Sequence, residues 1–244
     1  MAYRYATERT DHSALASGQV LRSAPGFPGF PVRLASELLQ RALAHTTDQG
    51  ETPVRLWDPC GGSGYLATVL GLLHRDRLSH VRVSDIDEEA VVLAARNLEL
   101  LTADGLAARE EELRRSARDF GRVEYVERAE AARVLAAALA QQGGDLPHET
   151  FTADVFTLTD PVDADVVVTD VPYGEMTAWS GQAPDEGHVG AMLRSLGGVL
   201  PQHAVVVITA KTRRVSLPEG VRALERVKVG TRSGALVRAR DVAP

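Results

Sequence analysis

A glycine-rich turn between an apolar run and a helical pattern constrains this chain more than any other feature. Residues 54–57 predict a strand, residues 58–64 (Asp-Pro-Cys-Gly-Gly-Ser-Gly) predict a tight turn, and residues 65–73 have helical periodicity. Glycine has no side chain to keep a ligand from the backbone, and it accepts positive φ. The turn therefore predicts a nucleotide-like cofactor that lies against Gly62 and Gly64.

The acidic residue that opens the turn indicates which cofactor this is. Gly62, Gly64 and Ala67 also fit the dinucleotide-binding pattern. Asp58, however, would stand where a dinucleotide places its pyrophosphate, and a carboxylate a few ångströms away repels that group. S-adenosylmethionine has no phosphate and carries a positive α-ammonium and a positive sulfonium. Asp58 therefore favours S-adenosylmethionine, and we assign the cofactor loop to Asp58, Cys60, Gly62 and Gly64.

A second strand-like run delivers another acidic residue to the cofactor. Residues 81–84 lead to Asp85, at the distance from Gly64 at which one helix and one strand bring a carboxylate to ribose hydroxyls. Asp87 lies two residues further on and could share or replace that role. The alternative for each is a turn former or the N-cap of the next helix.

Two later strand-like runs end in the same way. Residues 151–153 lead to Asp154, which is placed to accept a hydrogen bond from an adenine amino group, and residues 164–169 lead to Asp170. Ligands of open parallel sheets bind outside the carboxyl ends of the strands, so we expect four carboxylates to surround one crevice with negative potential. A divalent metal is another use for clustered carboxylates, but their places on separate strands favour the cofactor.

Composition bounds the class of protein. The 244 residues are enough for one large domain or one domain with a substantial insertion. The single cysteine excludes a disulfide framework, and the seven histidines have no zinc-like spacing, so we expect no metal. No apolar run of about 18 residues and no N-terminal signal pattern occur. We expect a soluble, cytoplasmic protein that has no membrane partner and is a monomer.

Positive charge is concentrated near the C-terminus. The net charge of −6 disfavours nucleic acid, but residues 211–240 contain nine basic and two acidic residues. Their net charge of +7 leaves −13 on the remainder. A basic end on an acidic body can meet phosphates through one face; a strand edge protected by charge is the alternative. We assign Lys211, Arg213 and Arg214 to substrate binding.

The N-terminal part predicts an arm, a stiff loop and a helix. Residues 1–24 have little periodicity, residues 25–31 (Pro-Gly-Phe-Pro-Gly-Phe-Pro) form the loop, and a helix begins at Pro31. Phe30, like the neighbouring Phe27, either fixes this helix to the core or lines the cofactor or base pocket. We assign Phe30 and Arg33 to the substrate site.

The interval of residues 102–152 is too long for an ordinary connection. It predicts two helices, at about 104–119 and 127–142, which are ended by Gly143 and Gly144. This insertion should project from the core. Its charges are mixed in sign, which favours a solvated helical pair over an element that grips RNA or a partner.

The C-terminal part completes a sheet. It predicts a helix at about 189–197, a buried strand at 204–209, and a hairpin of strands 223–229 and 235–239 joined by residues 230–234. The fold class is α/β: a mostly parallel, seven-stranded, doubly wound sheet of the methyltransferase type, with an antiparallel C-terminal hairpin and a helical insertion.

We expect one domain over residues 1–244. Its parts are an N-terminal arm and helix (1–47), a cofactor-binding half (48–102), the helical insertion (103–150), and a catalytic half with the C-terminal hairpin (151–244).

These motifs resemble those of class I S-adenosylmethionine-dependent methyltransferases that modify nucleobase nitrogens. More closely, residues 23–35, 56–73, 169–175 and 230–233 are similar to the AviRa family of 23S rRNA guanine methyltransferases, and the resemblance covers nearly the full chain. It implies a Rossmann-like fold, methylation of one guanine of 23S rRNA at N1, and resistance to avilamycin-type orthosomycin antibiotics.

One residue departs from the family pattern. A second cysteine is expected after Cys60, and Gly61 stands there instead. Because glycine only increases access to the backbone, we still expect the cofactor to bind. Cys60 itself is predicted to be a small packing residue, since a cysteine in the cofactor loop is poorly placed for nucleophilic attack on a base.

Residues 170–173 resemble the Asn/Asp-Pro-Pro-Tyr motif of amino-nitrogen methyltransferases, with valine in place of the first proline. The resemblance implies that Asp170 accepts the proton of guanine N1, assisted by the carbonyl beside Pro172. Tyr173 would stack on a base that has been turned out of its stem, together with Trp179 or Phe30. We predict Asp170, Pro172 and Tyr173 as catalytic residues, with Asp170 also near the cofactor.

Two other functions remain open from the sequence. One is methylation of a different nitrogen, guanine N2 or adenine N6, or of a small molecule. The other is a non-catalytic RNA-binding assembly factor with a vestigial cofactor pocket.

Overall fold

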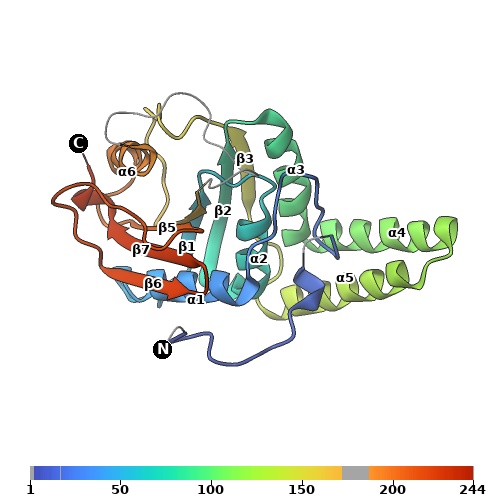
Figure 1. Ribbon diagram of the computed structural model, residues 1–244. Coiled ribbons are helices and arrows are strands. Elements are labelled where there is room, and N and C mark those ends of the chain that lie inside the picture. The colour runs from blue at the N-terminus through green and yellow to red at the C-terminus, as the bar shows by residue number, and fades with distance from the viewer. Residues whose placement is uncertain (1–2, 17, 172–186, 244) are drawn as a thin grey trace.

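The computed structural model describes residues 3–16, 18–171 and 187–243. A seven-stranded sheet with the order β3-β2-β1-β4-β5-β7-β6 forms the centre of this part (Figure 1). The strands are β1 (Val54–Asp58), β2 (Leu78–Asp85), β3 (His148–Thr152), β4 (Val166–Asp170), β5 (Val205–Ala210), β6 (Glu225–Val229) and β7 (Arg232–Arg238). Strands β3, β2, β1, β4 and β5 are parallel, and β7 is antiparallel to both of its neighbours. The predicted fold class is confirmed.

Both faces of the sheet are buried because its central strands are apolar on both sides. In β4, Val166 and Val168 belong to one core cluster and Val167 belongs to the other. The first cluster lies under α1 (Val32–Leu43), α2 (Tyr65–Leu73) and α3 (Glu88–Leu98), and the second under α6 (His188–Val199). Short 3₁₀ turns occur at Ser13–Leu15, Arg75–Arg77, Glu99–Leu101 and Ala239–Asp241.

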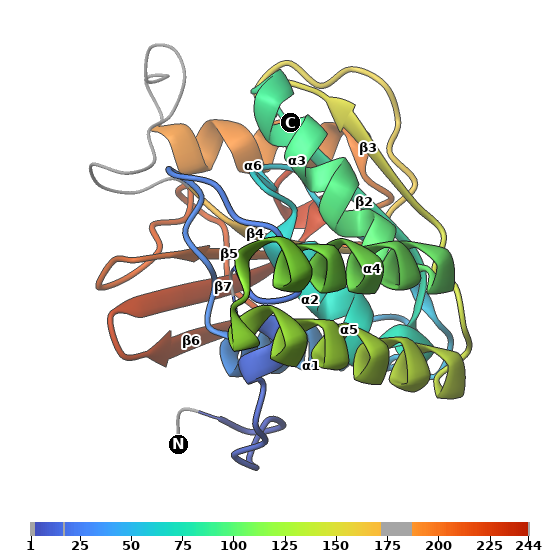
Figure 2. The ribbon, with the colours of Figure 1, turned by 90° about the vertical axis from the view of Figure 1, so that its right-hand side faces the viewer.

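The insertion is a helical hairpin that extends away from the sheet (Figures 1 and 2). It consists of α4 (Ala103–Phe120) and α5 (Val123–Gln141), and Gly121 turns between them with a φ of 63°. The Thr102 hydroxyl caps α4 by accepting from the Gly105 N–H at 3.0 Å. The two predicted helices are therefore present. No helix in the described residues is long and apolar enough to cross a membrane.

A buried carboxylate holds the N-terminal arm against α1. Glu37, fully buried, accepts hydrogen bonds of 2.7–2.8 Å from the backbone N–H groups of Arg4, Tyr5 and Ala6. Arg41 adds an ion pair to Glu37 at 2.7 Å and a second to Glu225 of β6 at 2.6 Å. The arm is thus tied both to a helix and to the edge strand.

The C-terminal hairpin differs from its predicted form. Val229 pairs directly with Arg232, so that only residues 230–231 form the turn and β7 begins at Arg232 rather than at residue 235. The tight turn is possible because Gly230 adopts a φ of 56°. As a result Arg232 lies at the start of a strand, at the same edge of the sheet as the carboxyl end of β5.

Candidate active site

The carboxyl ends of three parallel strands bring three predicted aspartates together. Asp58 ends β1, Asp85 ends β2 and Asp170 ends β4. Asp58 is 2% exposed. Burial raises the pKa of Asp58 to about 7, and the charges of Asp85 and Asp170 act in the same direction. Three of the four predicted aspartates therefore lie at the same edge of the sheet.

The cofactor loop takes a conformation that requires glycine. Gly62 and Gly64 have φ values of 52° and 70°, and a Cβ at Gly64 would lie 3.0 Å from the Ala94 backbone of α3. The Gly62 N–H donates a 2.8 Å hydrogen bond to the Asp85 carboxylate. The loop therefore joins the ends of β1 and β2. At Gly62 and Gly64 it has no side chain beyond the backbone.

Gly61 has a different role from the one predicted. A Cβ at this position would collide with Cγ1 of Val83 in β2, and the Gly61 N–H donates at 2.9 Å to the Ser84 carbonyl. Glycine here lets the loop pack directly on β2. Its effect is close packing rather than greater access of a ligand to the backbone.

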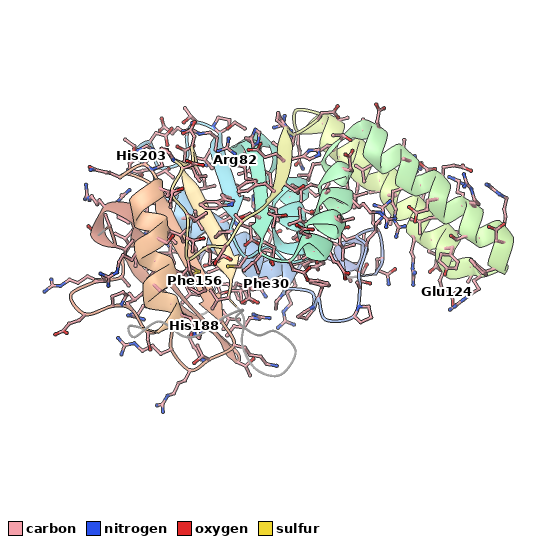
Figure 3. The ribbon with its side chains drawn as sticks, turned by 90° about the horizontal axis from the view of Figure 1, so that it is seen from above. Phe30, Arg82, Glu124, Phe156, His188 and His203 are labelled. Carbon is pink, nitrogen blue, oxygen red and sulfur yellow. The ribbon has the colours of Figure 1, made fainter. Side chains whose placement is uncertain are left out.

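A hollow of about 90 Å³ lies between this loop and the loop that precedes α1. Asp58 and Asp170 both line it, together with Phe27 and Phe30. The Phe27 ring covers Gly62, since a Cβ there would lie 3.2 Å from it. Phe30 is buried and belongs to the core, so it both fixes the loop and lines the hollow. In Figure 3, Phe30 and Phe156 are labelled beside each other near the middle of the view with His188 just below them, and Arg82 and His203 lie along the upper side.

Asp170 is paired with an arginine that the sequence analysis did not assign to the site. Nη1 of Arg232 lies 2.6 Å from each oxygen of the Asp170 carboxylate. The Thr209 hydroxyl donates to the same carboxylate at 2.6 Å. The Arg232 guanidinium also lies over the Phe30 ring, 4.7 Å from its centroid. Arg232 therefore balances the charge of Asp170, so this carboxylate adds less to the predicted negative potential of the crevice than an unpaired one would.

Two other predicted aspartates have local structural roles. Asp87 is the N-cap of α3 and accepts from the Glu89 N–H at 2.9 Å. Asp154 follows β3 and accepts from the Phe156 N–H at 2.9 Å in a turn. Neither carboxylate is buried, so each keeps accessible lone pairs. Their contacts to ribose and adenine stay predictions.

The predicted substrate arginines and lysine fall into two groups. Arg33 donates to the Ala6 and Thr7 carbonyls at 2.6 and 2.8 Å, so its guanidinium holds the N-terminal arm and does not line the hollow beside Gly62. Lys211, Arg213 and Arg214 are exposed in the loop that leaves β5. They therefore lie at the carboxyl edge of the sheet, as the candidate site does.

Three predicted residues, Pro172, Tyr173 and Trp179, lie outside the described residues. Their roles in catalysis and base stacking stay predictions.

Cys60 is unsuited to nucleophilic chemistry. Burial raises the pKa of its thiol well above the ordinary value, and the charges of Asp58 and Asp85 add to this effect. The side chain packs against the core cluster under α6. Within the described residues, no group of three or more histidine, cysteine, aspartate or glutamate side chains is placed to hold a metal ion.

S-adenosylmethionine fits the residues of this site. Asp58 is a buried carboxylate that accepts a 3.4 Å hydrogen bond from the Cys60 N–H, and it makes no ion pair with another described residue. A buried anion of this kind is stabilised by a cationic ligand. The cofactor's α-ammonium would supply that charge.

Comparison with known proteins decides the family. The family model described as rRNA methyltransferase AviRa matches residues 1–232. The chain belongs to the AviRa family. A relative from Streptomyces viridochromogenes, named 23S rRNA (guanine(2535)-N(1))-methyltransferase, is 53% identical over 99% of this chain and 97% of its own length.

Solved structures of AviRa agree with this result. The chain is similar to the rRNA methyltransferase AviRa from S. viridochromogenes in structures at 2.4 Å and 1.5 Å, with TM-scores of 0.90 and identities of 53% and 52%. Each match covers 99% of this chain and 98% of the other. The resemblance to the AviRa family and the Rossmann-like methyltransferase fold are both confirmed.

Proposed function

We propose that this protein transfers a methyl group from S-adenosylmethionine to N1 of a guanine in 23S rRNA. One observation carries the proposal: Asp58, beside the glycine loop, and Asp170, at the end of β4, line the same hollow. One carboxylate is thereby suited to a cationic donor, and the other to the nitrogen that receives the methyl group. The AviRa relative whose name gives guanine N1 as its target supports the choice of atom.

The residues of the chain perform binding, positioning and proton transfer. When bound, S-adenosylmethionine supplies an electrophilic methyl group. Asp58 and the glycine loop would hold its charged end, and Asp85 would bind its ribose hydroxyls. Asp170 accepts the N1 proton of guanine. Holding N1 in line with the methyl group provides much of the rate acceleration, because it makes the transfer effectively unimolecular.

The proposed substrate has consequences for where and how the protein acts. Ribosomal RNA places its action in the cytoplasm, and the exposed loop of Lys211, Arg213 and Arg214 provides positive charge for phosphates at the edge that carries the site. A methyl group on a base that contacts avilamycin would weaken the antibiotic's binding. We therefore propose that expression of this protein raises the avilamycin concentration that a sensitive host tolerates.

Methyl transfer to 23S rRNA tests the proposal. Tritiated methyl incorporation and mass mapping of the digested RNA should identify one N1-methylguanine. Asp170→Ala and Asp170→Asn should lower the rate by about 10²- to 10⁴-fold while the calorimetric affinity for S-adenosylmethionine is retained.

Asp165→Ala is a matched control for these variants. Asp165 lies at the opposite end of β4 and is paired with Arg55 at 2.8 Å, so its loss should reduce stability without reducing the rate of transfer. Full activity of both Asp170 variants would refute the role of Asp170. Absence of S-adenosylmethionine binding by the wild-type protein would instead indicate the RNA-binding assembly factor, and a methyl group on guanine N2, adenine N6 or a small molecule would correct the target.

A further inference from the structure

The Asp170–Arg232 pair presents a hydrogen-bond acceptor and a donor side by side at the proposed reaction site. Nη1 of Arg232 lies 2.6 Å from both Asp170 oxygens, and the two side chains are 11% and 21% exposed. A third side chain fixes the acceptor, because the Thr209 hydroxyl donates to Asp170 Oδ1 at 2.6 Å. The pair is therefore an ordered feature at the edge of the hollow.

The strand register explains why these two residues meet. Asp170 is paired with Thr209 of β5, and Thr209 is paired with Gly234 of β7. Arg232 precedes Gly234 by two residues and so lies on the same face of β7. The Arg232 side chain crosses β5 and reaches Asp170. The guanidinium carbon of Arg232 lies over the Phe30 ring, 4.7 Å from its centroid.

The order of donor and acceptor matches one purine and not the other. On its Watson–Crick edge, guanine carries the O6 acceptor next to the N1–H donor. Adenine carries the N6 amino donor next to the N1 acceptor, which is the reverse order. A carboxylate beside a guanidinium therefore makes two hydrogen bonds with guanine, whereas adenine would oppose donor to donor and acceptor to acceptor.

We propose that Arg232 binds O6 of the target guanine while Asp170 accepts the N1 proton, so that the pair selects guanine over adenine. This inference rests on the proposed function. In the protein without RNA the two side chains satisfy each other, and the flipped base replaces part of that contact with its own edge.

The same arrangement assists the transfer itself. The N1–H bond breaks and its proton passes to the Asp170 carboxylate. The electron pair of N1 forms the new bond to the methyl carbon, and the sulfur–methyl bond of the cofactor breaks with its electrons remaining on sulfur. Negative charge that develops on the base as the proton leaves is shared with O6, where the fixed charge of Arg232 stabilises it.

An ordinary structural ion pair is the competing explanation, and the chain supplies its own control. At the opposite end of β4, Arg55 donates to Asp165 at 2.8 and 2.9 Å. This second pair has the same chemistry and also joins neighbouring segments of the sheet, but it lies away from the hollow. Arg55→Gln should lower thermal stability and leave the kinetics of methyl transfer unchanged.

The experiment compares wild type, Arg232→Gln, Arg232→Lys and Arg55→Gln on an RNA fragment that contains the target base. The target is guanosine or 6-thioguanosine, whose sulfur is a weaker acceptor than O6. We expect Arg232→Gln to lower kcat/KM on guanosine by about 10- to 100-fold. We also expect the guanosine-to-thioguanosine ratio of kcat/KM to fall about tenfold in this variant. The intrinsic acidity of the two bases is common to both enzymes and cancels in that comparison.

A binding measurement without cofactor provides a readout independent of catalysis. Wild type should prefer RNA with guanosine at the target over RNA with adenosine by about tenfold, and Arg232→Gln should lose that preference. Arg232→Lys retains the charge and should recover part of the rate, which also guards against loss of folding as the cause.

The outcomes separate the inference from the function on which it rests. If wild type fails to methylate guanosine N1, the proposed function is wrong. If wild type methylates it, and Arg232→Gln keeps both the guanosine-to-thioguanosine ratio and the preference for guanosine over adenosine, then Arg232 does not read O6 and the inference is overturned.

Discussion

The buried amide of Asn97 in α3 donates a 2.9 Å hydrogen bond to the carbonyl oxygen of Ser63 in the cofactor loop. The same amide donates to the Arg22 carbonyl at 3.0 Å, and its oxygen accepts from the Arg22 N–H at 2.8 Å. One side chain thus fixes both the glycine loop and the segment that leads from the N-terminal arm. The position of the loop is therefore set by its contact with α3 as well as by its own glycines.

Replacement of Asn97 by alanine should lower the free energy of unfolding by about 3 kcal/mol, because buried backbone groups lose their partners. It should also weaken binding of S-adenosylmethionine, since the loop loses its support. Urea denaturation and calorimetry measure the two effects. Arg96→Ala, at the exposed neighbouring position, is the control and should change stability by less than about 0.5 kcal/mol. An Asn97→Ala protein as stable as this control would contradict the role of the amide.

Cofactor affinity should depend on pH through Asp58. Because burial raises its pKa to about 7, the carboxyl group without ligand is largely protonated below that pH. A cationic ligand binds the ionised form, so affinity for S-adenosylmethionine should rise with pH up to about 7 and then level off. Calorimetry in buffers of different ionisation enthalpy should detect the released proton. In Asp58→Asn the affinity should be low and lack this rise.

The same carboxyl group should make stability fall as pH rises. Its pKa is higher in the folded protein, about 7, than in the unfolded chain, so the folded state binds the proton more tightly. The free energy of unfolding therefore loses a contribution as pH rises from about 4 to about 7. Urea denaturation across this range should show a shallower decline for Asp58→Asn than for wild type. Equal declines in the two proteins would mean that Asp58 titrates normally.

Affinity for RNA should become less dependent on salt when the basic loop is neutralised. The triple replacement of Lys211, Arg213 and Arg214 by alanine removes three exposed charges, each worth about 0.7–0.9 in the slope of log K against log salt if it meets a phosphate. Fluorescence anisotropy over a KCl series measures this slope.

A matched control is available in the helical hairpin. Arg114, Arg118 and Arg133 are also exposed, but each is paired with a glutamate of the hairpin, Glu110, Glu111 and Glu130 respectively. Their replacement by alanine should leave the slope unchanged. If the hairpin variant reduces the slope of log K against log salt more than the loop variant does, RNA binds the insertion rather than the loop after β5.

Gly61→Ala should destabilise the protein by about 1–3 kcal/mol, because the added methyl group would overlap Val83 Cγ1 in a packed core. The double variant Gly61→Ala with Val83→Ala should be more stable than the sum of the two single effects predicts, since removing the valine methyl groups makes room for the new one. Additive losses in thermal unfolding would show that the loop avoids Val83 in solution.

The sequence predicts those residues of the site that stand at the carboxyl ends of strands. Asp58, Asp85 and Asp170 could be predicted because each directly follows an apolar run, and parallel strands place such positions at one edge. Arg232 could not, since its contact with Asp170 depends on a two-residue turn at 230–231 and on the register of β7 against β5. The sequence places Arg232 in a longer connection at 230–234, as one of the nine basic residues of 211–240.

The sequence also does not show whether an arginine such as Arg33 binds the substrate or another part of the chain. Arg33, which the sequence analysis assigns to the substrate site, donates to carbonyl groups of the N-terminal arm, and its contact with substrate stays a prediction. The arm has no periodic pattern that would predict where it lies. Its path is set by the buried carboxylate of Glu37, a long-range contact that only the folded chain reveals.

That carboxylate makes the first few residues part of the folding unit. A chain shortened to begin at residue 7 would leave an ionised group enclosed in the protein with three of its hydrogen-bond donors gone. Truncation there would disturb α1 and, through Arg41, the outermost strand of the sheet. Although the first residues have no periodic sequence pattern, they therefore stabilise α1 and, through it, a strand near the C-terminus.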